Sequence, residues 1–354
     1  MKIFFATLLF LFTPPAQAEQ RTSWDGTLYG YASTTTLQAN SVLNPGNQAA
    51  RIPQRTSVAE ARFNFKAEND TLRFFLRPII LTEDARNTFG SQQHNEAYLS
   101  QWQLRVRTAE AWSVTAGREV LNWGPAQFRS PSSPFYFNNG RSNPMSELSG
   151  VDALKVVFTP DVNNAAYIAH LSGSGHIQND PWRDTWLVKA DHRGGDWAGG
   201  VVLAKIPDQI TFVGAHIQQT LTDALLLYGE AGSSTRTDAL LGAAYTLENG
   251  QSLAAEYLHH GYGYTASETT AYFSGAVHAA PALLGRDYLH LLWQSNSMSG
   301  DNYWRLMWTR NLTDDSQQVA GYGEFKLDKR WTGYALAMLS AGGARREFAS
   351  LNSP

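Results

Sequence analysis

The sequence predicts an all-β fold: a transmembrane, antiparallel, up-and-down β-barrel of about 16–18 strands with one lumen-facing loop. Three observations predict it: a secretory leader, segments of roughly ten residues that alternate apolar and polar side chains, and no apolar run long enough for a membrane-spanning helix. Residues 60–66, Glu-Ala-Arg-Phe-Asn-Phe-Lys, show the alternation clearly. A soluble β-sandwich is the alternative fold with the same alternation.

The first 18 residues have the parts of a signal peptide. Lys2 precedes an apolar stretch over residues 3–12, and Ala16 and Ala18 form an Ala-x-Ala cleavage site. An apolar stretch of about ten residues is too short to span a bilayer. We therefore expect residues 1–18 to be a signal peptide and residues 19–354 to form a single barrel domain in the cell outer membrane.

The composition suits such a barrel. The chain has no cysteine, 12% aromatic residues and a formal net charge of −3. A closed hydrogen-bond ladder needs no disulfide, and aromatic rings suit the girdles at the two membrane interfaces. Because there is no basic excess, we expect no nucleic-acid partner. The expected partners are outer-membrane lipid and either small polar or anionic solutes or a surface polysaccharide.

The strands are predicted from amphipathic segments separated by turn residues. Short turns rich in Asn, Asp and Gly, such as residues 68–71, 193–196 and 248–251, follow even-numbered segments. Longer connections mostly follow odd-numbered ones. An up-and-down barrel with short periplasmic turns and long external loops gives this alternation of short and long connections, which a sandwich does not require. The long connections are 38–56, 81–94, 123–150, 173–183 and 261–286. The expected strands lie near 24–37, 57–68, 71–80, 95–107, 111–122, 151–160, 164–172, 184–193, 196–205, 209–219, 223–232, 236–246, 251–260, 287–295, 301–310, 318–327 and 330–341.

This count is odd, whereas a closed antiparallel barrel from one bacterial chain needs an even number of strands. Either residues 346–351 close the barrel or the last strand is missing from the sequence, and we favour the second interpretation.

The connection over residues 123–150 is the main candidate for a functional site. It is rich in Pro, aromatic and amide residues and low in the Lys and Glu of a solvated loop. Such a loop is expected to fold into the lumen and form a constriction. Arg129 and Arg141 would supply positive charge there, while Trp123, Phe128 and Tyr136 would narrow the passage. The alternative is an external lid held against the rim.

Arginine also recurs at alternate positions of successive strands, so that these side chains share one face of the sheet. This pattern predicts a wall of positively charged side chains in the lumen. Arg62 alternates with Phe63, and Trp102, Leu104 and Val106 alternate with polar residues, so the apolar side chains are expected to face lipid. The alternative is ordinary lumen filling, with the cations paired to Glu60, Glu96, Glu119 and Glu230. The arginines expected on this wall are Arg62, Arg73, Arg77, Arg105 and Arg107.

The sequence has no signature of an enzyme. It lacks a Gly-x-Ser-x-Gly elbow, a His-Glu-x-x-His motif, a phosphate-binding loop and a cysteine nucleophile. His259 and His260 are adjacent on a strand, so their side chains should point to opposite faces and cannot readily share a metal. We therefore expect no catalytic residues, no cofactor and no metal.

Residues 117–125 carry a family resemblance. They read Gly-Arg-Glu-Val-Leu-Asn-Trp-Gly-Pro, and Asn143-Pro144 follows. This resembles the Gly-Arg-x-x-x-x-Trp-Gly hairpin edge of Gram-negative outer-membrane barrels, including substrate-specific porins and capsule-assembly barrels. In those families a Trp-Gly-Pro turn opens a lumen-facing loop. The chain differs from the capsule-assembly barrels in lacking an obvious helical segment, which counts against polysaccharide anchoring. It differs from both groups at its carboxyl terminus.

Together these features predict an outer-membrane channel that passes small polar or anionic solutes through an Arg-lined lumen. The alternative function is surface assembly, or the binding or export of an exopolysaccharide.

Overall fold

The computed structural model describes residues 21–141, 147–177, 180–276, 281–296 and 302–350. The predicted signal peptide, residues 1–18, and the Asn143-Pro144 pair lie outside the described residues. In the described part of the chain, 17 strands follow one another, each hydrogen-bonded antiparallel to the next. They are β1 (Arg21–Thr34), β2 (Arg55–Glu68), β3 (Leu72–Asn87), β4 (Gly90–Arg107), β5 (Trp112–Glu119), β6 (Val151–Phe158), β7 (Asn164–Gly173), β8 (Thr185–Gly194), β9 (Trp197–Lys205), β10 (Phe212–Thr220), β11 (Leu225–Ser233), β12 (Thr237–Thr246), β13 (Ser252–His260), β14 (Asp287–Gln294), β15 (Asn302–Asn311), β16 (Gln317–Lys326) and β17 (Thr332–Ala341).

The alternating sequence gives each strand two different faces, as β13 illustrates. Glu256 and Leu258 are buried on the inner face, at 1% and 0% exposure, whereas Leu253 and Tyr257 on the outer face are 45% and 44% exposed. Large apolar side chains exposed on the outside of a curved sheet are what a barrel presents to lipid. The all-β, up-and-down architecture predicted from the sequence is therefore confirmed.

Two predicted connections differ from the structure. The expected loop at 81–94 is wrong, because β3 and β4 continue as a ladder to a tight turn, with Asn87 opposite Gly90. Most residues of this extension are polar and exposed, so the apolar alternation that marks the other strands is absent. The backbone ladder holds it together, with polar side-chain contacts such as the ion pair between Arg86 and Asp84.

The connection between β13 and β14 contains a helix that the sequence analysis did not predict, α1 (Ala266–Phe273). Its N-terminus has a capping box in which Glu268 N donates to Thr265 Oγ1 and Thr265 N donates to Glu268 Oε2. In the described part of the chain, no helix is long and apolar enough to cross a membrane.

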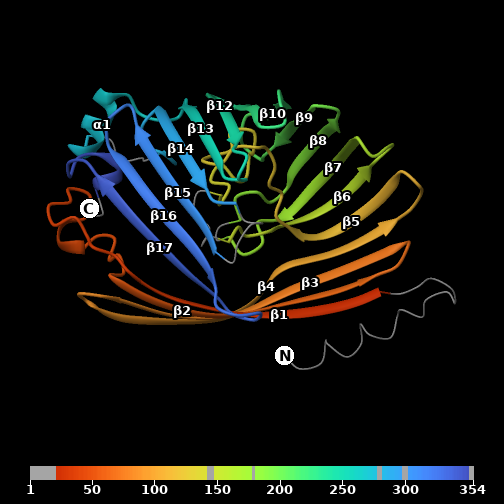
Figure 1. Ribbon diagram of the computed structural model, residues 1–354, viewed down its shortest axis with the longest axis horizontal. Helices are drawn as coiled ribbons and strands as arrows, with labels where there is room; N and C mark the ends of the chain where they lie inside the picture. The colour runs from red at the N-terminus through yellow and green to blue at the C-terminus, as the bar shows by residue number, and fades with distance from the viewer. Residues whose placement is uncertain (1–20, 142–146, 178–179, 277–280, 297–301, 351–354) are drawn as a thin grey trace.

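The two ends of the sheet approach each other where β1 and β17 meet (Figure 1). Tyr29 of β1 stacks on Tyr334 of β17, with ring centroids 5.1 Å apart, and Tyr334 Oη donates to Gly30 O at 2.9 Å. Among the described residues, no strand ladder joins β1 to β17. Residues 347–349 form a short 3₁₀ helix, so the described residues at 346–350 do not supply the closing strand considered from the sequence.

Candidate functional site: an inward loop and the passage beside it

The connection between β5 and β6 lies inside the curve of the sheet in its described parts, residues 120–141 and 147–150 (Figure 1). Two carboxylates on the opposite wall hold its backbone. Glu230 of β11 accepts hydrogen bonds from Ala126 N at 2.8 Å and from the hydroxyls of Ser130 and Ser132 at 2.5 and 2.7 Å. Such bonds satisfy backbone N–H groups that would otherwise be buried without partners.

Glu256 of β13 holds the next part of the loop. Gln127 N donates to its Oε1 at 2.6 Å and Phe128 N donates to its Oε2 at 2.8 Å. Tyr228 Oη donates to Oε1 as well, at 2.7 Å. Both oxygens of this buried carboxylate are thus occupied, so the loop is bound to the inner wall in a defined position.

A pair of glycines on the inner wall lets the loop backbone approach closely. Gly214 of β10 and Gly232 of β11 lie opposite each other in the ladder. A Cβ atom on Gly232 would lie 1.9 Å from Pro131 O, and one on Gly214 would lie 2.4 Å from Ser132 O. Both positions therefore need glycine because the loop lies directly on them.

We expect Gly232→Ala to displace the loop from the wall and to lower the free energy of unfolding by roughly 1–3 kcal/mol, the usual effect of overpacking. Denaturant unfolding in detergent and single-channel conductance would detect the loss of stability and the movement of the loop. Gly321→Ala on β16 is the matched control, because a Cβ there meets nothing within 4 Å. Equal stability and conductance of the two variants would contradict the proposed contact.

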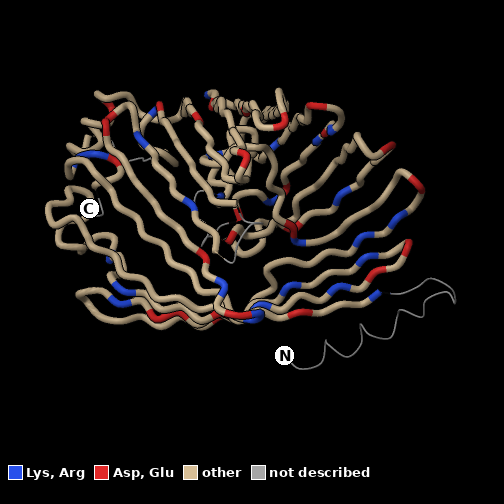
Figure 2. The backbone as a smooth tube through the Cα atoms, in the orientation of Figure 1, with Lys and Arg blue, Asp and Glu red and all other residues tan. Residues whose placement is uncertain are grey.

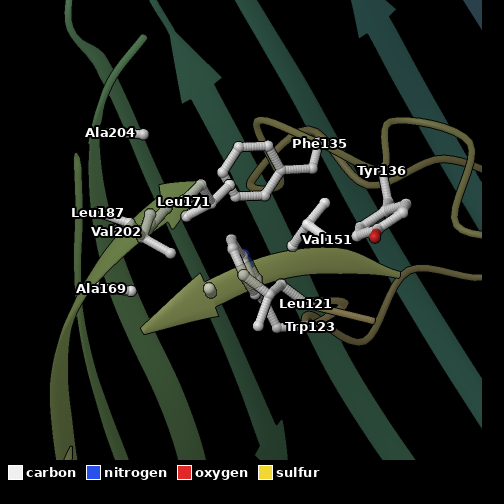
Figure 3. Close-up of a cluster of buried hydrophobic side chains, with 11 residues drawn as sticks. Leu121, Trp123, Phe135, Tyr136, Val151, Ala169, Leu171, Leu187, Val202 and Ala204 are labelled. Carbon is white, nitrogen blue, oxygen red and sulfur yellow. The ribbon is translucent and has the colours of Figure 1, made fainter. Parts of the chain in front are cut away.

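An apolar cluster fixes the first half of the loop against β6 to β9 (Figure 3). Trp123 and Tyr136 belong to it, at 9% and 4% exposure, and pack with Phe135 and with inner residues of the strands. Trp123 Nε1 donates to Ser132 O at 3.1 Å, and Lys189 Nζ lies 5.3 Å from the centroid of its ring. Burial raises the pKa of the Tyr136 hydroxyl above its ordinary value, and this hydroxyl donates to Ser149 O at 2.5 Å.

The tip of the loop packs against β14. Phe128 is 4% exposed and stacks on His290 with ring centroids 5.0 Å apart. Arg129 lies over the same Phe128 ring, at 4.4 Å, and donates to Phe128 O at 2.8 Å. Burial lowers the pKa of the Arg129 guanidinium to about 10, so the group remains charged at neutral pH.

The loop packs on parts of the inner face from β6 to β14, with a cavity of about 590 Å³ between residues 131–137 and β10 to β13. Open space also lies between the loop and β1 to β4. A cavity of about 480 Å³ lies there. Three guanidinium groups reach it, those of Arg62 from β2, Arg77 from β3 and Arg141 from the loop, against the single carboxylate of Glu147. Its other lining residues are Tyr29, Gln101, Val120, Asn139, Gly140 and Leu148.

The predicted site residues are therefore divided between two places. Arg62, Arg77 and Arg141 come together at the cavity, whereas Arg129 lies at the loop tip on the β14 side. Trp123, Phe128 and Tyr136 are buried beneath the loop, where they fix its shape, and do not line the cavity.

The remaining predicted cations lie toward the β4–β5 turn. Arg73 and Arg105 are directly opposite each other in the ladder, and Arg105 Nε donates to Ser113 Oγ at 3.2 Å. Arg107 is exposed at the end of β4. Figure 2 shows Lys and Arg recurring along the strands in the lower part of the view.

The sequence analysis missed the residues that position the loop. Glu230 was considered only as a partner for arginine, and Glu147, Glu256 and Gly232 were not singled out. A carboxylate within an otherwise apolar inner face was the available signal, as in residues 226–232, Leu-Leu-Tyr-Gly-Glu-Ala-Gly. A buried carboxylate needs hydrogen-bond donors, although the pattern does not show which donors supply them.

Comparison with protein-family models gives no match, and comparison with curated proteins gives none. Solved structures do resemble the chain. OccK7 (OpdD) of Pseudomonas aeruginosa has a TM-score of 0.57 at 11% identity, covering 92% of this chain and 94% of that one. OccK11 (OpdR) of the same organism has 0.57 at 11% identity, with coverages of 94% and 92%.

A mutant of Rhodopseudomonas blastica porin has a TM-score of 0.51 at 10% identity, covering 94% of this chain and 96% of that one. Identities this low show a likeness of fold alone. The chain thus has the fold of a porin-type β-barrel.

Proposed function

We propose that this protein is an outer-membrane channel that passes small polar or anionic solutes between the inward loop and the β1–β4 wall. The observation that carries the proposal is the cavity beside the loop, which Arg62, Arg77 and Arg141 line together with one carboxylate, that of Glu147, while Arg62 also pairs with Glu60 outside the lining. Fixed positive charges at a narrow point attract anions and repel cations, and low-dielectric walls strengthen the effect. The fold shared with a porin supports the same function.

The arrangement of the loop explains how the passage would be narrow yet stable. Glu230 and Glu256 bind the loop to the β11 and β13 wall, and the cavity lined by Arg62, Arg77 and Arg141 lies between the loop and the facing wall. Trp123, Phe128 and Tyr136 would then narrow the passage indirectly, by fixing the position of the loop. Arg73, Arg105 and Arg107 would extend the basic surface toward the periplasmic end.

The test is conductance in planar bilayers with purified, detergent-refolded protein. We expect steady single-channel currents and, in a KCl gradient, a reversal potential that indicates preference for chloride. Preference for potassium would contradict an anion-selective passage. Absence of current from correctly folded protein would contradict the channel itself, and binding or export of a surface polysaccharide would become the better account.

A further inference from the structure

Glu147 occupies a cluster of hydrogen-bond donors on the barrel wall. Its carboxylate oxygens lie 3.1 Å from Arg62 Nη2 and 3.3 Å from Arg77 Nη1. Ser100 Oγ donates to Glu147 Oε1 at 3.2 Å. These donors come from β2, β3 and β4, which are consecutive strands, whereas Glu147 comes from the inward loop. We call Arg62, Arg77 and Ser100 the wall clamp.

The wall clamp has the chemistry of a carboxylate site. Guanidinium groups match the geometry of carboxylates and form charge-assisted hydrogen bonds with them. Arg77 pairs with Glu147 through Nη1, whereas Arg62 has a second carboxylate partner, Glu60, to which its Nη2 donates at 3.2 Å. The cavity also contains Arg141, which contacts Ala126 O and not Glu147 in the described structure.

The position of the clamp matters because it lies on the surface of the passage. Arg62, Arg77 and Glu147 all line the same cavity, and the side chain of each is about one-quarter exposed, at 23%, 25% and 25%. A solute that moves beside the wall therefore meets the donors and the carboxylate that already engages them. Glu147 neutralises part of the positive charge at the two guanidinium groups where an anion would bind.

We propose that Glu147 is a built-in competitor for the wall clamp, which a solute carboxylate must displace in order to bind there. This inference rests on the proposed channel function and names the residue that limits its preference for anions. Binding of a solute would involve the exchange of one carboxylate for another on the same two guanidinium groups. Such an exchange favours weak, reversible binding, which suits passage through a channel.

A purely structural role for Glu147 gives a different expectation. If Glu147 only ties the loop to the wall, its loss would loosen the loop and raise conductance for both ions. If it is a competitor, its loss would free Arg77 and one contact of Arg62, which Glu60 also holds, and would strengthen anion binding. Glu147→Gln separates the two roles, because the amide oxygen in place of Oε1 can still accept from Ser100 and Arg77 and keep the loop near the wall, whereas the side chain carries no charge and faces Arg62 with an NH2 group.

The experiment uses citrate as the probe carboxylate and measures its block of chloride current through the full-length protein in planar bilayers. For Glu147→Gln we expect the citrate concentration that halves the current to fall about fivefold, the order expected on loss of a partly exposed ion-pairing competitor. The anion-to-cation permeability ratio should rise in the same variant. Glu324→Gln on β16 is the control for loss of one negative charge elsewhere, because Glu324 accepts from Tyr322 Oη and does not line the cavity.

Unchanged citrate block in Glu147→Gln, with a conducting and citrate-sensitive parent, would overturn the inference and leave the channel function intact. A parent that does not conduct would overturn both. If Glu147→Gln fails to fold, as judged by heat-modifiable migration on gels, Glu147→Ala is measured for both ions. Stronger citrate block without a rise in potassium current supports the competitor, whereas a rise in current for both ions overturns it. An equal effect of Glu324→Gln would also overturn the inference, because the charge alone would then account for the change.

Discussion

Replacing Glu230 and Glu256 together by Ala is expected to release the inward loop and to raise single-channel conductance about twofold or more, as the narrowest section widens. Each carboxylate accepts several donors of the loop, including Ala126 N, Gln127 N and Phe128 N. A buried donor left without an acceptor costs about 1–3 kcal/mol, so the loop should move to a position where water can solvate these groups. Bilayer conductance measures the result directly.

Two controls isolate the cause. Glu230→Gln with Glu256→Gln removes the same charges but keeps an acceptor oxygen at each position, so its conductance should remain closer to that of the parent. Glu324→Ala removes a carboxylate that no loop donor contacts. If the double Ala variant conducts like the parent while remaining folded, the two carboxylates do not hold the loop.

The fold could be predicted from the sequence because its cause is local. Alternation at a period of two gives every strand a lipid-facing and an inner side, and the turn residues separate the strands. The same argument fails for residues 81–94, where both faces are mostly polar and no apolar alternation marks the continuing ladder. The strand count lies within the predicted range, but the sheet ends at β1 and β17 without a joining ladder in the described residues.

The helix α1 could have been found. Thr265 and Glu268 have the Thr-x-x-Glu spacing of a capping box, which is a local signal for a helix N-terminus. The sequence analysis used the lack of a helical segment as an argument against a polysaccharide-related role. Because α1 is present, that argument no longer separates a channel from a polysaccharide-related role. Conductance measurements are needed to separate the two functions.

The site was only partly predictable because its contacts join distant parts of the chain. The composition of the loop predicts that it is packed, and Arg62 and Arg77 fall on the inner phase of their strands. By contrast, the contact of Ala126 with Glu230 spans 104 positions and that of Gln127 with Glu256 spans 129. No local pattern indicates which wall residue faces which loop residue, so Arg129 and Arg141 could not be distinguished before the structure separated them.

Because Arg141 lines the cavity and Arg129 does not, the structure predicts a large change in ion selectivity for one set of arginines and a small change for the other. Replacing Arg62, Arg77 and Arg141 together by Gln should lower the anion-to-cation permeability ratio about tenfold, because it removes three positive charges from the cavity and leaves Glu147 without its partners. Reversal potentials in a KCl gradient measure the ratio.

Arg129→Gln is the matched control, since Arg129 lies on the Phe128 ring on the β14 side and does not line the cavity. A selectivity change in Arg129→Gln as large as that of the triple variant would place the selective charge at the loop tip instead of at the β1–β4 wall. An unchanged ratio in the triple variant would show that solutes do not pass beside these guanidinium groups.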